Sequence, residues 1–100
     1  MLKHIVMWKL KEFAEGKTKA ENALIMKESL ERLVGIVPEI ISLQVGSNEK
    51  ESDMAYDEVL ISTFADAEAL ARYKVHPEHV KVSDYCKKIR EGRVFVDFHE

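Results

Sequence analysis

The sequence predicts a single α+β domain in which one antiparallel sheet is covered by helices. Its length of 100 residues fits one domain. Segments with apolar residues at every second position are interleaved with segments of helical period, in the order β-α-β-β-α-α-β. If the two consecutive helices count as one broken unit, this order is the split β-α-β-β-α-β plan of the ferredoxin-like fold, which has a four-stranded antiparallel sheet.

The composition excludes several classes of protein. With 46% hydrophobic and 33% charged residues, the chain has an ordinary globular composition. The formal charge is -3 and the basic residues are scattered among acids, which argues against a nucleic-acid surface. No apolar run is long enough for a membrane span, and the first residues do not resemble a signal peptide. The single Cys86 excludes an internal disulfide and favours a cytoplasmic location, where we expect a packed thiol rather than a reactive one.

The first half of the chain predicts one strand and the longest helix. Residues 2–10 carry apolar side chains on both faces, which is typical of a strand covered on both sides. A polar connection follows, and then Thr18 and Glu21 match a capping box. Gly35 and Pro38 end the helix after about 17 residues. Its expected core-facing stripe is Ala20, Ala23, Leu24, Lys27, Leu30, Leu33 and Val34.

The second half predicts three strands and a broken helical unit. Asp66 is a good N-cap residue for a short helix. Pro77 keeps His76 out of the helical region and suits the first turn of a new helix, which Gly92 follows. The predicted elements are strands over 40–46 and 55–64, helices over 67–74 and 77–90, and a strand over 93–99.

The predicted sheet leaves an apolar face without helices. Such a surface is unfavourable in water, and the simplest way to bury it is to pack two sheets face to face. The sequence therefore predicts a homodimer that closes into an α/β barrel. The residues on this face are Ile5, Met7, Val59, Ile61, Val94 and Val96.

Candidate functional residues gather around the break between the two helices. His79 falls in the first turn of the second helix, where the helix dipole favours a neutral imidazole, and Tyr73 precedes the break. His4 and Glu58 are predicted to face the helices from neighbouring strands. A carboxylate beside a histidine fixes its tautomer and raises its pKa, which would make His4 a tuned base. The alternative is a buried structural pair, since a buried histidine needs a hydrogen-bond partner.

Other candidates have structural alternatives as well. His76 either caps the end of the preceding helix or joins His79 and Glu58 as a metal ligand. The spacing of the two histidines spans a turn and does not match a helical ligand pair, so we expect no metal. Trp8 is expected in the core rather than as a stacking platform. Trp8, Leu43 and Leu60 are expected to line the same pocket.

Several motifs identify a resemblance to a known family. They are Lys3–Trp8, Gly35–Pro38, Tyr56–Asp57, Tyr73–Val80 and Arg93–Phe98. Together they resemble the stress-responsive dimeric α/β-barrel (Dabb) domain over almost the whole chain, and the His-Pro-x-His segment is the most specific part. The resemblance implies the same dimeric barrel that the alternation predicts.

The resemblance also implies two possible functions. Plant relatives include a polyketide cyclase, in which a tyrosine and a histidine at the positions of Tyr73 and His79 do acid–base work, and a pocket histidine matches His4. Glu58 stands where that cyclase has another histidine, and the first helix here has no aromatic residue.

We therefore expect a homodimer that binds a small hydrophobic or carbonyl metabolite without a cofactor. The alternative is a cofactor-independent cyclase- or isomerase-like enzyme that uses His79, Tyr73 and His4. A third possibility follows from a related barrel family of cofactorless monooxygenases that act on electron-rich aromatic compounds.

Overall fold

The computed structural model describes residues 1–100 and contains one four-stranded antiparallel sheet. The strand order is β4-β5-β1-β6, so β4 and β6 are the edge strands. This is the α+β, ferredoxin-like arrangement that the sequence predicts. The strands are β1 (Leu2–Leu10), β4 (Ser42–Ser47), β5 (Glu58–Phe64) and β6 (Arg90–His99), and a separate small hairpin contains β2 (Phe13–Ala14) and β3 (Lys17–Thr18).

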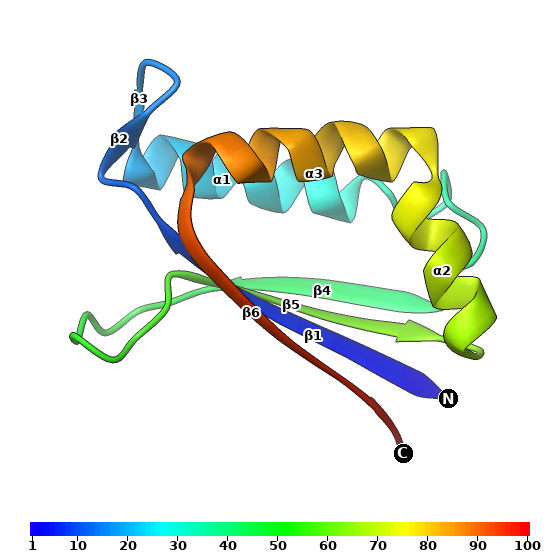
Figure 1. The fold of residues 1–100 in the computed structure, drawn as a ribbon. Coiled ribbons are helices and arrows are strands. Elements are labelled where there is room, and N and C mark those ends of the chain that lie inside the picture. Colours follow the sequence, from blue (N-terminus) through cyan, green and yellow to red (C-terminus); the bar gives the residue numbers. More distant parts are fainter.

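Three helices cover one face of this sheet. Figure 1 shows α1 and α3 side by side above the sheet and α2 at one end, while the opposite face has no helix. None of the three is both long and apolar enough to cross a membrane. The helices are α1 (Lys19–Glu31), α2 (Ala67–Val75) and α3 (Pro77–Ile89).

The predicted helix starts are confirmed. The amide of Glu21 donates to the Thr18 hydroxyl at 3.2 Å and the Thr18 amide donates to the Glu21 carboxylate at 3.0 Å, which completes the capping box. Asp66 accepts the amide of Ala69 at 2.8 Å and caps α2. Pro77 is the first residue of α3, as expected for a residue with a fixed φ and no amide hydrogen.

The predicted core stripe of α1 is only partly right. Leu30 and Leu33 are buried as predicted, but Leu24 is 57% exposed and Val34 is 50% exposed. Asn22 and Met26, which lie outside the predicted stripe, are buried. The helix is rotated because the Asn22 amide donates to the carbonyl of Ala14 at 3.0 Å. The connection before α1, which the sequence predicts only as polar, therefore folds into the β2–β3 hairpin and anchors the helix. The helix also ends at Glu31, earlier than predicted.

Several other boundaries differ from the prediction. The second strand of the sheet begins at Ser42 rather than residue 40, and the third begins at Glu58 rather than residue 55. The last strand starts earlier, at Arg90, because β1 continues to pair with it beyond an irregularity near its end. In α3 the buried residues are Cys86 and Ile89, while Val80 is 40% exposed.

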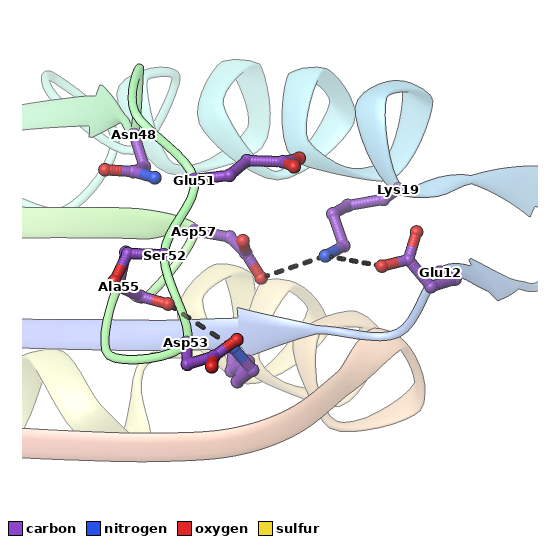
Figure 2. Close-up of a pocket in the computed structure, with 9 residues that line it drawn as sticks. Glu12, Lys19, Asn48, Glu51, Ser52, Asp53, Ala55 and Asp57 are labelled. Carbon is purple, nitrogen blue, oxygen red and sulfur yellow. Dashed lines mark hydrogen bonds and ion pairs between the residues drawn. The ribbon is translucent and has the colours of Figure 1, made fainter.

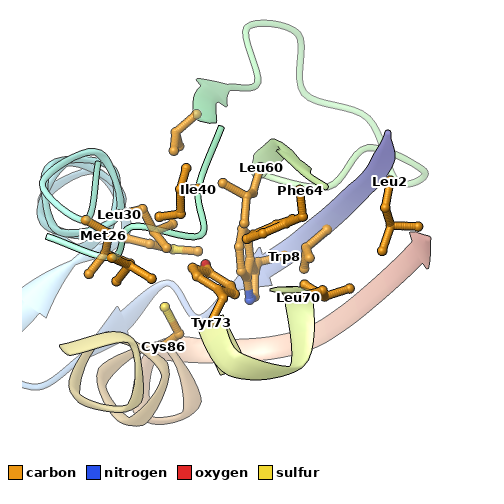
Figure 3. Close-up of a cluster of buried hydrophobic side chains, with 14 of the residues drawn as sticks. Leu2, Trp8, Met26, Leu30, Ile40, Leu60, Phe64, Leu70, Tyr73 and Cys86 are labelled. Atoms are coloured by element: carbon orange, nitrogen blue, oxygen red, sulfur yellow. The ribbon is translucent and has the colours of Figure 1, made fainter. Parts of the chain in front are cut away.

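The helix-covered face of β1 contributes to the hydrophobic core. Leu2, His4, Val6, Trp8 and Leu10 alternate on this face and are all buried. Figure 3 shows Trp8 and Leu60 of the sheet close to Tyr73 of α2 and Cys86 of α3. Leu30 of α1 lines the same region, so the covered face meets all three helices at one place, and that place holds the candidate site.

The opposite face of the sheet carries the six predicted apolar residues in two rows across three strands. Ile5 pairs with Ile61 on one side and Val96 on the other, and Met7 pairs with Val59 and Val94 in the same way. Four of the six are large apolar side chains with more than a third of their surface exposed, namely Met7, Ile61, Val94 and Val96.

Candidate functional site

A cavity of about 170 Å³ lies between the covered face of the sheet and the helices. It brings together five of the eight predicted site residues, namely His4, Trp8, Leu60, Tyr73 and His79. The other predicted residues, Glu58, His76 and Leu43, do not line it. The remaining lining residues are Val6, Leu30, Val82, Ser83, Cys86, Lys87, Arg90 and Arg93.

Tyr73 lies deep in this site with an unsatisfied hydroxyl group. The residue is 1% exposed, and its hydroxyl has no hydrogen-bond partner in the protein. Its ring packs against the rings of Phe64 and His79, with centroids 4.9 Å and 4.2 Å away. Burial raises the pKa of Tyr73 well above its usual value, so the hydroxyl stays protonated and is available as a donor.

His79 is held in one tautomer by the backbone. Its Nδ1 lies 3.1 Å from the carbonyl oxygen of Lys74, and because a carbonyl can only accept, Nδ1 carries the proton. The Nε2 atom is then an unprotonated acceptor. Burial is the main reason that the pKa of His79 is lowered, and the positive charge of Arg93 acts in the same direction. His79 is therefore a neutral base at pH 7.

His4 is paired with Asp97 and not with Glu58, so the predicted His4–Glu58 pair is wrong. His4 Nδ1 bonds the Asp97 carboxylate across the β1–β6 pairing. Glu58 shares the covered face, but it pairs with Trp8 whereas His4 pairs with Ser62. Four residues of strand, about 13 Å, separate the two positions. Burial lowers the pKa of His4 more than Asp97 raises it.

Glu58 belongs to a different groove, which runs between α1 and the end of β4. Its carboxylate accepts the Ser47 hydroxyl at 2.8 Å. Burial raises the pKa of Glu58 to about 7, and the Ser47 hydrogen bond opposes this shift. The groove also contains Lys27 and measures about 620 Å³.

His76 and Leu43 have structural positions outside the cavity. His76 Nδ1 accepts the amide of Glu78 at 3.1 Å, so the side chain caps the start of α3. His76 also caps the end of α2, as expected, but through its backbone: its amide donates to the carbonyl of Tyr73 at 3.2 Å, while the ring serves the free amides of α3. Leu43 lies on β4 and packs against the edge of the core.

A polar groove lies beneath the loop that precedes β5 and is separate from the cavity. Figure 2 shows Lys19 between the carboxylates of Glu12 and Asp57. Lys19 forms ion pairs with Glu12 at 3.0 Å and with Asp57 at 3.6 Å, and Asp57 accepts the amide of Leu10 at 2.7 Å. These contacts fasten the loop to the end of β1. The loop itself does not border the His4–Tyr73–His79 cavity.

The residues missed by the sequence reasoning come from α3 and β6. Arg93, Phe95 and Asp97 lie on the same face of β6. Their partners on β1, which are Trp8, Val6 and His4 respectively, all belong to the covered face. The alternation of β6 places these charged residues opposite Val94 and Val96. The alternation of β6 indicates the face on which these charges lie, but the approach of Arg93 to the cavity depends on the turn from α3 into β6.

Comparison with solved structures supports the ferredoxin-like fold. A dimeric protein of unknown function with a ferredoxin-like fold from Bacteroides fragilis is 28% identical, with a TM-score of 0.81 over 99% of this chain and 95% of that chain. A Dabb family protein from Mesorhizobium loti is 21% identical, with a TM-score of 0.74 over 99% and 95% of the two chains. A hydroxynitrile lyase from Passiflora edulis is 15% identical, with a TM-score of 0.80 over 97% and 90%.

Sequence comparison shows the family. No curated protein matches the chain. The family model of the stress responsive A/B barrel domain matches residues 2–100. The relation to plant polyketide cyclases stays a prediction. The chain belongs to the stress responsive A/B barrel domain (Dabb) family.

Proposed function

We propose that this protein is a homodimer that binds a small carbonyl compound in the His4–Tyr73–His79 cavity. The observation that carries the proposal is the buried Tyr73 hydroxyl without a partner. Leaving such a group unsatisfied costs about 1–3 kcal/mol. A carbonyl oxygen in the cavity would accept a hydrogen bond from the hydroxyl and remove this cost. The volume of about 170 Å³ is smaller than a typical drug-sized pocket and favours a ligand of few atoms.

The dimer would form through the apolar open face of the sheet. The two rows of paired residues across β5, β1 and β6 supply a continuous apolar surface, which is typical of an interface. The similar structure from Bacteroides fragilis is described as dimeric, which supports this assembly. Because the helices lie on the other face, each subunit would keep its cavity on the outside of the barrel.

Ligand binding can be tested by nuclear magnetic resonance with the histidine rings as reporters. Small ketones and aldehydes would be titrated into the purified protein while the His79 and His4 ring signals are followed. We expect saturable shifts of both rings, and Tyr73→Phe should weaken binding about tenfold because one hydrogen bond is lost. If no carbonyl compound moves either ring, or if Tyr73→Phe binds equally well, the proposal is wrong.

The free Nε2 of His79 favours a second function, acid–base catalysis on the same ligand. His79 Nε2 would take a proton from the carbon next to the carbonyl, and the C–H electron pair would form the C=C bond of an enolate. The developing oxyanion would receive a hydrogen bond from the Tyr73 hydroxyl. In a β,γ-unsaturated carbonyl compound the enolate is a dienolate, so return of the proton from His79 to the γ-carbon would move the double bond and complete an isomerisation. Among structures of this fold, the Passiflora edulis protein is a hydroxynitrile lyase, so the fold also occurs in an enzyme.

Exchange of the ligand's α-hydrogens in deuterated water tests this function. His79→Ala should slow the exchange about 100-fold or more, the usual contribution of a general base. His99→Ala is the matched control, since His99 is exposed at the end of β6 and away from the cavity. Unchanged exchange in His79→Ala would leave binding as the only function.

A further inference from the structure

The His4–Tyr73–His79 cavity has a one-sided charge. Lys87, Arg90 and Arg93 line it, and no aspartate or glutamate does. This is unexpected for a chain with 18 acidic and 15 basic residues. The other grooves mix both signs: Lys27 occurs with Glu58 in one, and Lys81 with Glu78 in another. The lining therefore carries a net positive charge, which the Asp97 carboxylate behind His4 offsets only in part.

None of these three cations forms an ion pair within the protein. The ion pairs of the chain use other basic residues, such as Lys19 and Arg72. Asp97, which follows Arg93 on the same face of β6, bonds His4 instead. An arginine beside a cavity without a carboxylate partner keeps all of its guanidinium donors for another acceptor.

Arg93 is placed to reach the reacting groups. It leaves β6 on the helix-covered face, next to Trp8. Its guanidinium carbon lies 5.2 Å from the centre of the Phe95 ring. The side chain therefore extends along β6 toward Asp97, the residue that pairs with His4 of β1. Arg90 lies at the junction of α3 and β6, and Lys87 is one helical turn earlier.

We propose that the carbonyl compound in this cavity carries a carboxylate, which Arg93 binds with the support of Arg90 and Lys87. This assignment of a carboxylate rests on the proposed function, because the ligand occupies the same cavity. A guanidinium binds a carboxylate through two parallel hydrogen bonds, which also fixes the orientation of the ligand. The carboxylate at Arg93 and the carbonyl at the Tyr73 hydroxyl would hold a small oxo acid at two points, with an α-hydrogen facing His79.

The proposal is tested with a pair of probes that differ in charge. The probes are 2-oxobutanoate and its neutral methyl ester, each titrated into the full protein while the His79 and His4 ring signals are followed. We expect the acid to bind at least about tenfold more tightly than the ester at low salt, because a charge-assisted bidentate contact is gained. Added salt should weaken binding of the acid and leave that of the ester unchanged.

Variants assign the charge contact to Arg93. Arg93→Gln should reduce the affinity for the acid to that for the ester, and Arg93→Lys should restore part of the difference. Arg32→Gln is the matched control, because Arg32 lines the separate groove between α1 and α3. Thermal unfolding of each variant would confirm that the fold is retained.

The outcomes separate this proposal from the proposed function. If the acid and the ester shift the rings with equal affinity, or if Arg93→Gln keeps the preference for the acid, the carboxylate contact at Arg93 is wrong and the carbonyl site stands. If neither probe shifts the rings, both proposals fail. Inorganic phosphate and acetate would also be compared as competitors of 2-oxobutanoate. If phosphate displaces the acid more strongly than acetate does, the cations select a phosphate group and the proposed carboxylate contact is wrong.

Discussion

On β1, His4 and Trp8 point toward the helices, whereas Ile5 and Met7 point to the open side of the sheet. The covered face buries polar groups, and His4 and Glu58 are each only 2% exposed. The open face instead exposes apolar groups in paired rows across three strands. In a monomer this distribution is unfavourable on both faces. It becomes favourable if the covered face binds a ligand and the open face binds a second subunit.

The largest expected effect comes from a charge on the open face. Ile61→Lys places an ammonium group in each half of the proposed interface, and burying an unpaired charge costs several kcal/mol per ion. We expect loss of the dimer, with unfolding or aggregation of the separated chains, measured by light scattering coupled to size-exclusion chromatography. Leu24→Lys is the control, because Leu24 is exposed on α1. A dimer unchanged by Ile61→Lys, or a stable and soluble monomer, would contradict the sheet-to-sheet barrel.

A smaller effect concerns the buried carboxyl of the covered face. The pKa of Glu58 is raised to about 7 in the folded state from 4.5, so the folded protein holds this proton more tightly than the unfolded chain does. The contribution to stability is complete below pH 4.5 and is lost as the pH rises through about 7. The difference between 4.5 and about 7 corresponds to about 3.4 kcal/mol, and solvent screening of this groove-lining carboxyl should reduce the cost of its ionised form above that pH to about 2 kcal/mol.

Thermal unfolding of the wild type and Glu58→Gln between pH 5 and pH 8 measures this contribution. Glutamine does not titrate, so the variant should gain stability relative to the wild type as the pH rises. Burial lowers the pKa of His4 and His79, so these histidines reduce the stability of the folded protein as the pH falls. Their contribution is the same in the wild type and in Glu58→Gln, and it cancels in the difference between the two proteins. A constant difference between the two proteins would show that Glu58 is ionised throughout this range.

The smallest effect concerns Tyr73 in the unliganded protein. Its hydroxyl is buried without a partner, so Tyr73→Phe removes an unsatisfied group and leaves the ring contacts with Phe64 and His79 in place. We expect the variant to be more stable by about 1 kcal/mol in denaturant unfolding while it binds carbonyl compounds less well. A gain in stability together with a loss of binding is typical of a functional group, and a loss of stability would indicate a structural one.

The two faces also explain how much the sequence predicted. The period-two pattern of β1 assigns Ile5 and Met7 to one side and His4 and Trp8 to the other, and this assignment is confirmed. The pattern does not give the register between strands, and register decides that His4 meets Asp97 rather than Glu58. Two residues on the same face can be neighbours or lie about 13 Å apart, and the sequence alone does not distinguish these cases.

Helix α1 and the cavity charges escaped prediction for different reasons. In α1, a polar residue faces inward because Asn22 bonds the β2–β3 hairpin, and an apolar stripe cannot reveal this. In the cavity, Lys87 and Arg93 look like ordinary surface charges in the sequence. They are 6 residues apart, on a helix and a strand, and only the turn from α3 into β6 brings them to the same cavity.

The central claim is that the Tyr73 hydroxyl binds a carbonyl oxygen on the covered face. The most direct measurement is the ¹³C chemical shift of 2-oxobutanoate labelled at its carbonyl carbon, free and bound to the protein. A hydrogen bond withdraws electron density from the carbonyl carbon, so the bound signal should move downfield in the wild type and return toward its free position in Tyr73→Phe. A bound signal at the same position in both proteins would contradict the account.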